Sequence, residues 1–454
     1  MRKSSETGQP YGGGGARQAA PAGFCPAQMI EAELSRPVPA LRPDGERQRA
    51  WVLARLHAEP VGACVLQVPG EGLTPDEVAD ALWGAVREAV QDRYQGAGLR
   101  QPETLPGSGL GPAPGGWPFQ RDRAQVLADA PFISVVLCTR DRANQLEACL
   151  PWLERQQYPR FEVVVVDNAP AGNDVRKVIA AWRGAMPCRY VAEPRAGLSW
   201  ARNAGAGAAA GEIVAFIDDD EEPDRHWLAG LARGFARSAD VGAVTGAILP
   251  ARLDTPAQEM FELAGGHSKG RGFTAAVFSA DGPQSPLFPL PPFGAGGNMA
   301  FRREALARIG GFDVALGAGT PARGGEDSLA LTMALLAGYR IAYEPAAFVR
   351  HNHYPQLAGL ARQWHGYGTG LTAFYAALLR HRPAVLPQLI GLLPDAARYL
   401  HPANSDAAGA PGLPMSVRRR QRRGMISGPI AYVRSVRRAA KLAPVGADRP
   451  ELAR

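Results

Sequence analysis

Ile213-Val-Ala-Phe-Ile-Asp-Asp-Asp220, followed by Glu221-Glu222-Pro223, is the stretch that decides the fold. Five consecutive apolar residues predict a strand that is buried on both faces of a parallel sheet. The acidic residues come next, so we expect them at the sheet edge where open α/β sheets bind ligands. Adjacent carboxylates repel one another unless a cation or hydrogen-bond donors lie among them. One explanation is a bound Mg²⁺ or Mn²⁺; the other is that these residues begin a helix, whose dipole favours acidic side chains.

The same pattern of an apolar strand followed by a helix recurs on both sides of this stretch. We expect strands at residues 133–138, 161–166, 189–191 and 213–217, separated by helices such as 198–209. This alternation predicts an α/β fold with a doubly wound, mostly parallel sheet. Asp167 ends the second strand and would lie on the same edge as Asp218 and Asp220, where it could bond a ribose or base. A turn or helix-cap role beside Asn168 is the alternative.

Changes in composition divide the chain into five parts. Residues 28–98 predict a small α+β accessory unit, because two strands form a hairpin and Thr74-Pro-Asp-Glu77 is a capping box that opens a helix. The other predicted parts are a disordered tail at 1–27, a Pro/Gly-rich linker at 99–130, an α/β domain at 131–380 and a basic extension at 381–454.

Charge and cysteine usage narrow the classes of function. The chain has 454 residues and a formal net charge of +7, with much of the excess between Arg418 and Lys441. That segment could attract anionic lipid headgroups, but a solvated tail is an equally good explanation and nucleic-acid binding a weaker one. Five cysteines without a CxxC pair indicate reduced thiols. With no long apolar run, we expect a cytoplasmic protein, attached at most to the inner face of the membrane.

Gly324-Gly-Glu-Asp327 is a second acidic site, about a hundred residues downstream of the first. Asp327 would be a general base that deprotonates an acceptor hydroxyl if it faces the carboxylates of the first site. Alternatively, it caps its own helix.

Five motifs stand in a fixed order along the chain: Pro131-Phe-Ile-Ser-Val-Val-Leu-Cys-Thr-Arg-Asp141, Val163-Val-Val-Val-Asp-Asn168, Gly197-Leu-Ser-Trp-Ala-Arg-Asn203, Phe216-Ile-Asp-Asp-Asp220 and Gly325-Glu-Asp327. Together they resemble the family 2 glycosyltransferases, which have the GT-A nucleotide-sugar-binding fold. The resemblance covers residues 131–379. It implies an inverting, hexosyltransferase-like transfer of a sugar from a nucleotide-sugar donor to an acceptor hydroxyl, with a divalent metal, Mn or Mg, as cofactor.

The resemblance also implies roles for individual residues. Those around the nucleoside would be Thr139, Arg140, Asp141 and Asp167, and those around the nucleotide and its diphosphate would be Arg202, Asn203, Asp218 and Asp219. Asp218 and Asp220 match the DXD motif, with Asp220 as the direct metal ligand, and Asp327 matches the catalytic base. His351 stands where many such enzymes carry a metal-binding histidine. Gly297, Asn298 and Glu326 would lie on the acceptor side; a tight turn is the alternative for residues 294–298.

One departure from the family bears on the product. Processive members that make long polysaccharides have transmembrane helices and a Gln-x-x-Arg-Trp signature, whereas the comparable region here is Ala361-Arg-Gln-Trp-His-Gly366. We therefore expect the addition of a single sugar to a glycan, lipid-linked or small-molecule acceptor, for example in cell-envelope polysaccharide synthesis.

Two other functions fit parts of the pattern. A nucleotidyltransferase would need a Gly-rich basic signature after the first strand, and Thr139-Arg-Asp-Arg142 has no glycine. A non-catalytic sugar-nucleotide-binding or scaffolding protein would bind the donor without turnover.

Overall fold

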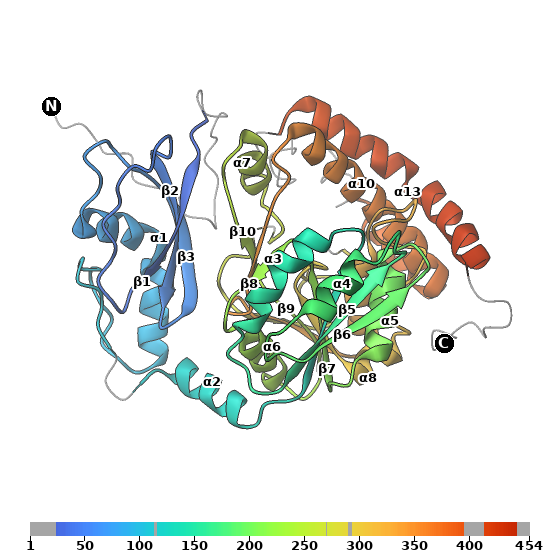
Figure 1. Ribbon diagram of the computed structural model, residues 1–454, viewed down its shortest axis with the longest axis horizontal. Helices are drawn as coiled ribbons and strands as arrows, with labels where there is room; N and C mark the ends of the chain where they lie inside the picture. Colours follow the sequence, from blue (N-terminus) through green and yellow to red (C-terminus); the bar gives the residue numbers. More distant parts are fainter. Residues whose placement is uncertain (1–23, 113–115, 269, 289–292, 395–412, 443–454) are drawn as a thin grey trace.

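The computed structural model describes residues 24–112, 116–268, 270–288, 293–394 and 413–442. Figure 1 shows a small N-terminal unit beside a larger α/β domain, with two long C-terminal helices lying along the larger domain. The predicted tail at 1–27 lies almost entirely outside the described residues.

A central sheet of eight strands organises the larger domain, in the order β11-β13-β9-β12-β7-β4-β5-β6. Four strands that the sequence predicts run parallel side by side: β7 (Ile213–Asp218), β4 (Ile133–Thr139), β5 (Phe161–Asn168) and β6 (Cys188–Glu193). The other half contains β9 (Val241–Thr245), β12 (Met299–Arg302), β13 (Arg340–Tyr343) and β11 (Ala276–Phe278), of which β12 and β11 are antiparallel to their neighbours. The predicted doubly wound, mostly parallel sheet is confirmed.

Both faces of this sheet are covered, which explains its continuous apolar strands. In β4, Val136 packs into the core on one face, while Val135 and Leu137 pack into the core on the other. The helices between strands are α3 (Ala143–Glu154), α4 (Asp174–Ala181), α5 (Leu198–Ala208), α6 (Trp227–Ala236), α8 (Arg303–Arg308) and α9 (Glu326–Leu336).

A second, three-stranded sheet lies directly beyond the acidic stretch. Its strands are β10 (Ile248–Pro250), β14 (Val349–His351) and β8 (Glu221–Pro223). Glu221 and Glu222 therefore belong to a strand, and the alternative that they begin a helix is wrong. Because His351 pairs with Glu221, this sheet holds the predicted histidine beside the acidic cluster. Helix α7 (Pro256–Leu263) follows β10.

The N-terminal unit contains β1 (Ala27–Glu33), β2 (Arg49–Leu56), β3 (Glu59–Gln67) and α1 (Pro75–Gly96). The hairpin and the capping box at Thr74 are as predicted. The segment at 99–130 is more ordered than a linker: it contains α2 (Pro118–Ala128), and Leu105 and Trp117 are buried in the core of the unit. Gly and Pro content concealed these apolar anchors.

Strand β2 joins the two parts because its side chains alternate between two cores. Ala50, Val52 and Ala54 face α1, whereas Trp51 and Leu53 pack with Phe348 and Tyr343 of the larger domain. Arg55 donates to Asp224 at 2.8 Å across the same interface, and both side chains are buried.

The C-terminal part forms α10 (Leu357–His381), the short η1 (Pro383–Val385), α11 (Leu386–Gly391) and α13 (Met415–Leu442). Figure 1 shows α13 beside α10. Along the described ranges, no helix is both long enough and apolar enough to cross a bilayer.

Candidate active site

The acidic cluster divides into one internal and two more accessible carboxylates. Asp219 is buried and accepts hydrogen bonds from Thr139 Oγ1 at 2.6 Å and Arg142 Nη1 at 2.9 Å. Burial raises the pKa of Asp219 to about 6, although Thr139 and Arg142 oppose the shift. The side chains of Asp218 and Asp220 are 36% and 25% exposed, so these two carboxylates are available to a ligand.

Arg202 is the buried centre of the site. Its guanidinium donates to Glu326 Oε1 at 2.9 Å, to the Gly296 carbonyl at 2.9 Å and to Asp218 Oδ1 at 3.4 Å. Glu326 is itself buried, and burial together with the neighbouring Asp327 raises its pKa to about 7. The predicted acceptor-side residue Glu326 therefore points inward, to Arg202.

Asp327 lies in the first turn of α9, which begins after Gly325 in the left-handed region with a φ of 89°. Its Oδ2 accepts the Gly296 N–H at 2.8 Å and its Oδ1 accepts the Ser328 N–H at 2.7 Å. Gly325 occupies the N-cap position, while Asp327 accepts a main-chain N–H in the first turn of its own helix, so the capping alternative stays open beside the catalytic one.

A cavity of about 630 Å³ lies at the carboxyl ends of β4 and β5. Asp141, Arg142 and Asp167 line it, together with the loop that contains Ala171. Asp167 accepts from Tyr190 Oη at 3.0 Å, while its other oxygen is buried without a hydrogen-bond partner. Burial raises the pKa of Asp167. Asp141 lies in the left-handed region with a φ of 53°. Its Oδ1 accepts the N–H of Ala171, which is in the loop that lines this cavity.

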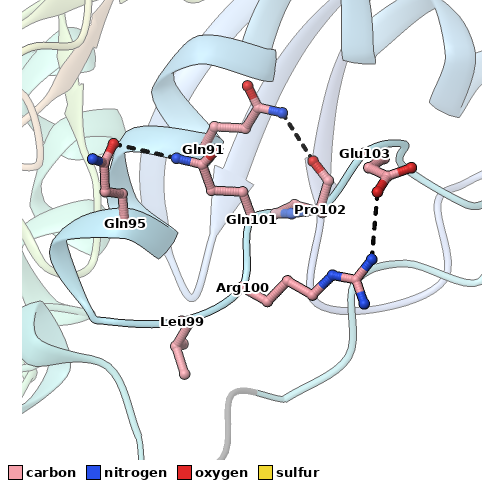
Figure 2. Close-up of a pocket in the computed structure, with 7 residues that line it drawn as sticks. All are labelled: Gln91, Gln95, Leu99, Arg100, Gln101, Pro102 and Glu103. Carbon is pink, nitrogen blue, oxygen red and sulfur yellow. Dashed lines mark hydrogen bonds and ion pairs between the residues drawn. The ribbon is translucent and has the colours of Figure 1, made fainter.

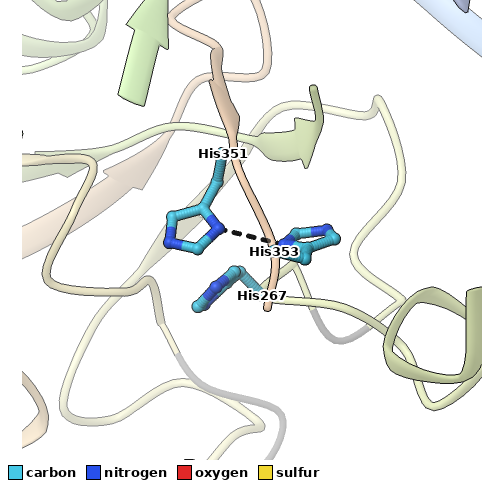
Figure 3. A group of neighbouring side chains, drawn as sticks. All are labelled: His267, His351 and His353. Carbon is cyan, nitrogen blue, oxygen red and sulfur yellow. Dashed lines mark hydrogen bonds between the residues drawn. The ribbon is translucent and has the colours of Figure 1, made fainter. Parts of the chain in front are cut away.

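Three histidines converge, as Figure 3 shows, and one of them, His351, lies beside Asp220. The ligand nitrogens of His267, His351 and His353 lie within 4.8 Å of one another. His351 Nε2 is 3.6 Å from Asp220 Oδ1, and its Nδ1 is 2.9 Å from His353 Nδ1. His353 Nε2 in turn is 2.7 Å from Glu262 Oε1 on α7. Burial lowers the pKa of His351 to about 4, so its ring is neutral at pH 7.

The remaining predicted residues lie around this centre. Arg140 is half exposed and forms a 3.9 Å ion pair with Asp141. Asn203 exchanges hydrogen bonds with the backbone of Phe312, and thereby holds a loop in place. Asn298 is fully buried, with its amide bonded to Trp227 and to two backbone carbonyls. A Cβ at Gly297 would collide with the Glu221 carboxylate, which explains the glycine.

Sequence reasoning missed two residues of the site, Arg142 and Glu262, and of the neighbouring histidines His351 and His353 it chose only His351. Arg142 was considered only as part of the segment 139–142, whose lack of glycine argued against a nucleotidyltransferase, and it was given no role in the site. His353 stands two residues from His351, and this spacing on an extended segment brings both to one side of the strand. Glu262 carried no sequence signal, because its helix meets the histidines only through the tertiary fold.

A second concavity, of about 480 Å³, lies on the N-terminal unit at the end of α1 (Figure 2). Its polar side chains bond mainly to their own neighbours: Gln91 to the Pro102 carbonyl, Gln101 to Gln95, and Arg100 to Glu103. It does not contribute to the cluster around Arg202.

Comparison with known proteins decides the family. Residues 134–310 match the model of Glycosyl transferase family 2. The succinoglycan biosynthesis protein ExoM of Rhizobium meliloti is 30% identical over 240 residues, which cover 51% of this chain and 71% of that protein. The chain belongs to glycosyl transferase family 2. It is thus a glycosyltransferase with the GT-A fold, whose motif-bearing strands are those of the central sheet.

Other relatives match shorter or more divergent regions. Glycosyltransferase AglE of Haloferax volcanii is 33% identical over 103 residues, but the match covers 22% of this chain and about a third (33%) of that protein. The glucosyl-dolichyl phosphate glucuronosyltransferase of the same organism is 23% identical over 236 residues, covering 48% of this chain and 68% of that protein. A solved mannosyltransferase from Pyrobaculum calidifontis, in complex with GDP-Man and Mn²⁺, is 22% identical with a TM-score of 0.42, and covers 69% of this chain and 88% of that chain.

Proposed function

We propose that this family 2 member transfers one sugar from a nucleotide-sugar donor to an acceptor hydroxyl, with inversion and with the help of a divalent metal, Mn²⁺ or Mg²⁺. The observation that carries the proposal is the convergence of Asp218, Asp220, Arg202 and Asp327 at the carboxyl ends of the strands, beside a cavity lined by Asp141 and Asp167.

The histidine chain supports a cation beside Asp220. The Glu262 carboxylate only accepts hydrogen bonds, so His353 Nε2 donates to it. In the tautomer in which His353 Nδ1 is an acceptor, His351 Nδ1 donates to it. The neutral His351 ring is left with an unprotonated Nε2 at 3.6 Å from the Asp220 carboxylate. His351 Nε2 and Asp220 Oδ1 are close enough to bind the same divalent cation.

The residues that would hold the metal are Asp220, His351 and Asp218, a set of oxygen and imidazole ligands that suits Mn²⁺. When bound, the cation would neutralise charge on the nucleoside diphosphate leaving group. Glu262 and His353 do not touch the metal in this proposal. They position the His351 ring, as outer hydrogen-bond partners of ligating histidines commonly do.

Asp327 acts on the acceptor. Its carboxylate takes the proton of the attacking hydroxyl as the new bond to the anomeric carbon forms and the bond to the diphosphate oxygen breaks. The Gly296 N–H holds one carboxylate oxygen at 2.8 Å, which fixes the direction of the base. Attack from the face opposite the leaving group inverts the anomeric configuration. Arg202, buried behind these groups, keeps the carboxylates together against their mutual repulsion.

The acceptor proposed here is lipid-linked, and the enzyme would work as a single-addition transferase at the membrane surface. The name of one relative, the glucosyl-dolichyl phosphate glucuronosyltransferase, describes a lipid-linked acceptor. The exposed face of α13 described below is the second support.

A donor screen tests the function. The protein would be heated with UDP-, GDP- and dTDP-sugars in the presence of Mn²⁺ or of EDTA. A donor at a hundred times its Kd stabilises the protein by about 2.7 kcal/mol. We expect one donor class to raise Tm with Mn²⁺ but not with EDTA, and slow donor hydrolysis to give the inverted sugar by proton NMR. No stabilisation and no release of nucleoside diphosphate with any donor would overturn the proposal.

A further inference from the structure

Exposed aliphatic side chains gather at the C-terminal end of the described chain. Of the twelve large hydrophobic residues that are exposed among the described residues, eight lie between Leu386 and Leu442. Ile426 is the most exposed of all, at 80%. Large apolar side chains in water at this density mark an interaction surface more often than chance.

Three of these residues form a ridge along α13. Ile426, Ile430 and Val433 follow the spacing i, i+4, i+7, which puts them on one face of the helix. The opposite face packs on α10, where Gly424 and Gly428 leave the helices so close that a Cβ at either would strike α10. The ridge therefore points away from the protein. On the preceding segment, Leu386, Ile390 and Leu393 repeat the spacing and are also exposed.

Positive charge surrounds the ridge. Helix α13 contains nine cationic residues and no acidic one. Arg419, Arg422 and Arg423 are exposed one to two turns before the ridge, and Arg434 and Arg437 are exposed at its other end. An apolar strip with flanking arginines is the pattern of a helix that lies in the interface plane of a bilayer.

We propose that the outer face of α13, with Ile426, Ile430 and Val433 inserted and its arginines on lipid phosphates, docks the enzyme on an anionic membrane surface. This inference rests on the proposed lipid-linked acceptor for its biological meaning, but its physical basis is independent of the donor and the metal. A second copy of this chain fits less well, because pairing two such helices would bring nine like charges against nine. An RNA partner would leave the aliphatic ridge without a role.

The protein-facing side of α13 contacts the segment that leads to α9. Ser435 Oγ on α13 accepts the Ala322 N–H at 3.1 Å, and Arg438 Nη1 donates to the Gly319 carbonyl at 2.6 Å. These contacts hold the segment that leads to Glu326 and Asp327. A bilayer under α13 would thus present lipid-linked hydroxyls close to the loop that carries the base.

Vesicle cosedimentation of the full-length protein, without donor or metal, tests the docking. The vesicles are phosphatidylcholine alone or with one-third phosphatidylglycerol. One variant combines Ile426→Ser with Ile430→Ser, and a second combines Arg419→Gln, Arg422→Gln and Arg423→Gln. The matched controls are Val277→Ser, exposed on β11, and Arg36→Gln with Arg87→Gln and Arg100→Gln, exposed on the N-terminal unit.

We expect wild type and both controls to bind the anionic vesicles and not the neutral ones. The arginine variant should bind about a hundredfold more weakly, which corresponds to about 1 kcal/mol per residue. The isoleucine variant should lose at least about tenfold, most clearly at high salt, because apolar burial is not screened. Unchanged Tm values establish that both variants fold.

Three results would overturn the proposal: wild type that stays in solution with anionic vesicles, arginine variants that bind as wild type does, or a dimer in solution that the isoleucine variant converts to a monomer. RNA binding that survives loss of the isoleucines, without vesicle binding, would also contradict it. Because donor and metal are absent from this assay, its failure is distinct from failure of the proposed transferase activity.

Discussion

Arg202 and Glu326 show how one buried pair sets the electrostatics of the site. The guanidinium and the carboxylate meet at 2.9 Å with both groups buried, and the second oxygen of Glu326 has no hydrogen-bond partner. Burial raises the pKa of Glu326 from its ordinary value of 4.5 to about 7. Its ionisation therefore takes place near neutral pH.

This shift predicts a pH dependence of stability. Since the folded-state pKa is the higher one, the stabilising contribution is fully present below about pH 4.5 and is lost as pH rises through 7. Glu326→Gln keeps an acceptor for Arg202 and removes the titration. The free energy of unfolding of this variant should fall less between pH 5 and 8 than that of wild type, measured by urea denaturation. Parallel curves would contradict the raised pKa.

The histidine chain makes a prediction about metal affinity. Glu262→Ala removes the acceptor of His353 Nε2 and frees the His351 tautomer, so Mn²⁺ affinity should fall about 10- to 100-fold. Glu262→Gln retains an acceptor oxygen and should restore most of the affinity. Both are measured by Mn²⁺ electron paramagnetic resonance, without substrate, and one site per chain is expected. If the two variants had equal Mn²⁺ affinities, the hydrogen bonds from Glu262 through His353 would not position His351.

Residues of the site differ in how well sequence predicted them. The motif at Asp218–Asp220 and the carboxylates Asp167 and Asp327 follow elements with clear periodicity, so their place at the sheet edge follows from topology. The inward direction of Glu326 and Asn298 does not, because side-chain orientation at a loop depends on what packs against it, here Arg202 and Trp227.

At the scale of the element, glycines decide how α13 lies on α10. A Cβ at Gly428 would strike the Thr372 hydroxyl and lie 3.0 Å from Ala373 N. Gly84, in the interior of α1, has nothing within 4 Å of the same position. Both are glycines inside a helix, but only Gly428 is packed against another helix.

Alanine substitution at these two positions should have opposite effects. Gly428→Ala should destabilise the protein by about 1–3 kcal/mol through overpacking, and should expose the arginines of α13 to trypsin. Gly84→Ala should stabilise it by up to about 1 kcal/mol, because alanine favours the helix. Thermal denaturation and limited trypsin digestion measure both. If Gly428→Ala were as stable and as resistant as Gly84→Ala, the close packing of α13 would be contradicted.

The elements were predicted best where periodicity is strong. Strands β4, β5 and β7, and helices α1 and α5, match the sequence expectation closely. The neighbouring strands β9 and β10, by contrast, belong to different sheets although two residues separate them. Likewise, Glu221–Pro223 pairs with β14, which lies far along the chain at Val349–His351, and local composition does not encode this contact.

At the scale of the whole molecule, the N-terminal unit and the catalytic domain share a core. Trp51 and Leu53 of β2 contribute to it, and the buried Arg55–Asp224 pair lies at its edge. The sequence predicted a small accessory unit at 28–98, separated by a linker from the α/β domain at 131–380. The structure instead makes the first unit a packed support for the second sheet.

Removal of the buried Arg55 guanidinium at this interface should destabilise the protein. Arg55→Met leaves Asp224 buried without its partner and should destabilise the protein by about 3–5 kcal/mol. The exposed ion-pair variant Arg100→Met is the control and should change stability by no more than about 0.5 kcal/mol. Calorimetry should also separate the N-terminal transition from the catalytic one in the first variant. A single transition at the wild-type Tm would contradict the proposed coupling of the units.

The most direct test of the central claim is donor turnover by Asp327→Asn, compared with wild type in the presence of Mn²⁺ and the donor found by thermal shift. We predict that the variant binds the donor within about threefold of wild type but releases nucleoside diphosphate about 10²- to 10⁴-fold more slowly, because the acceptor loses its base. A variant that binds the donor and turns it over at the wild-type rate would contradict the account.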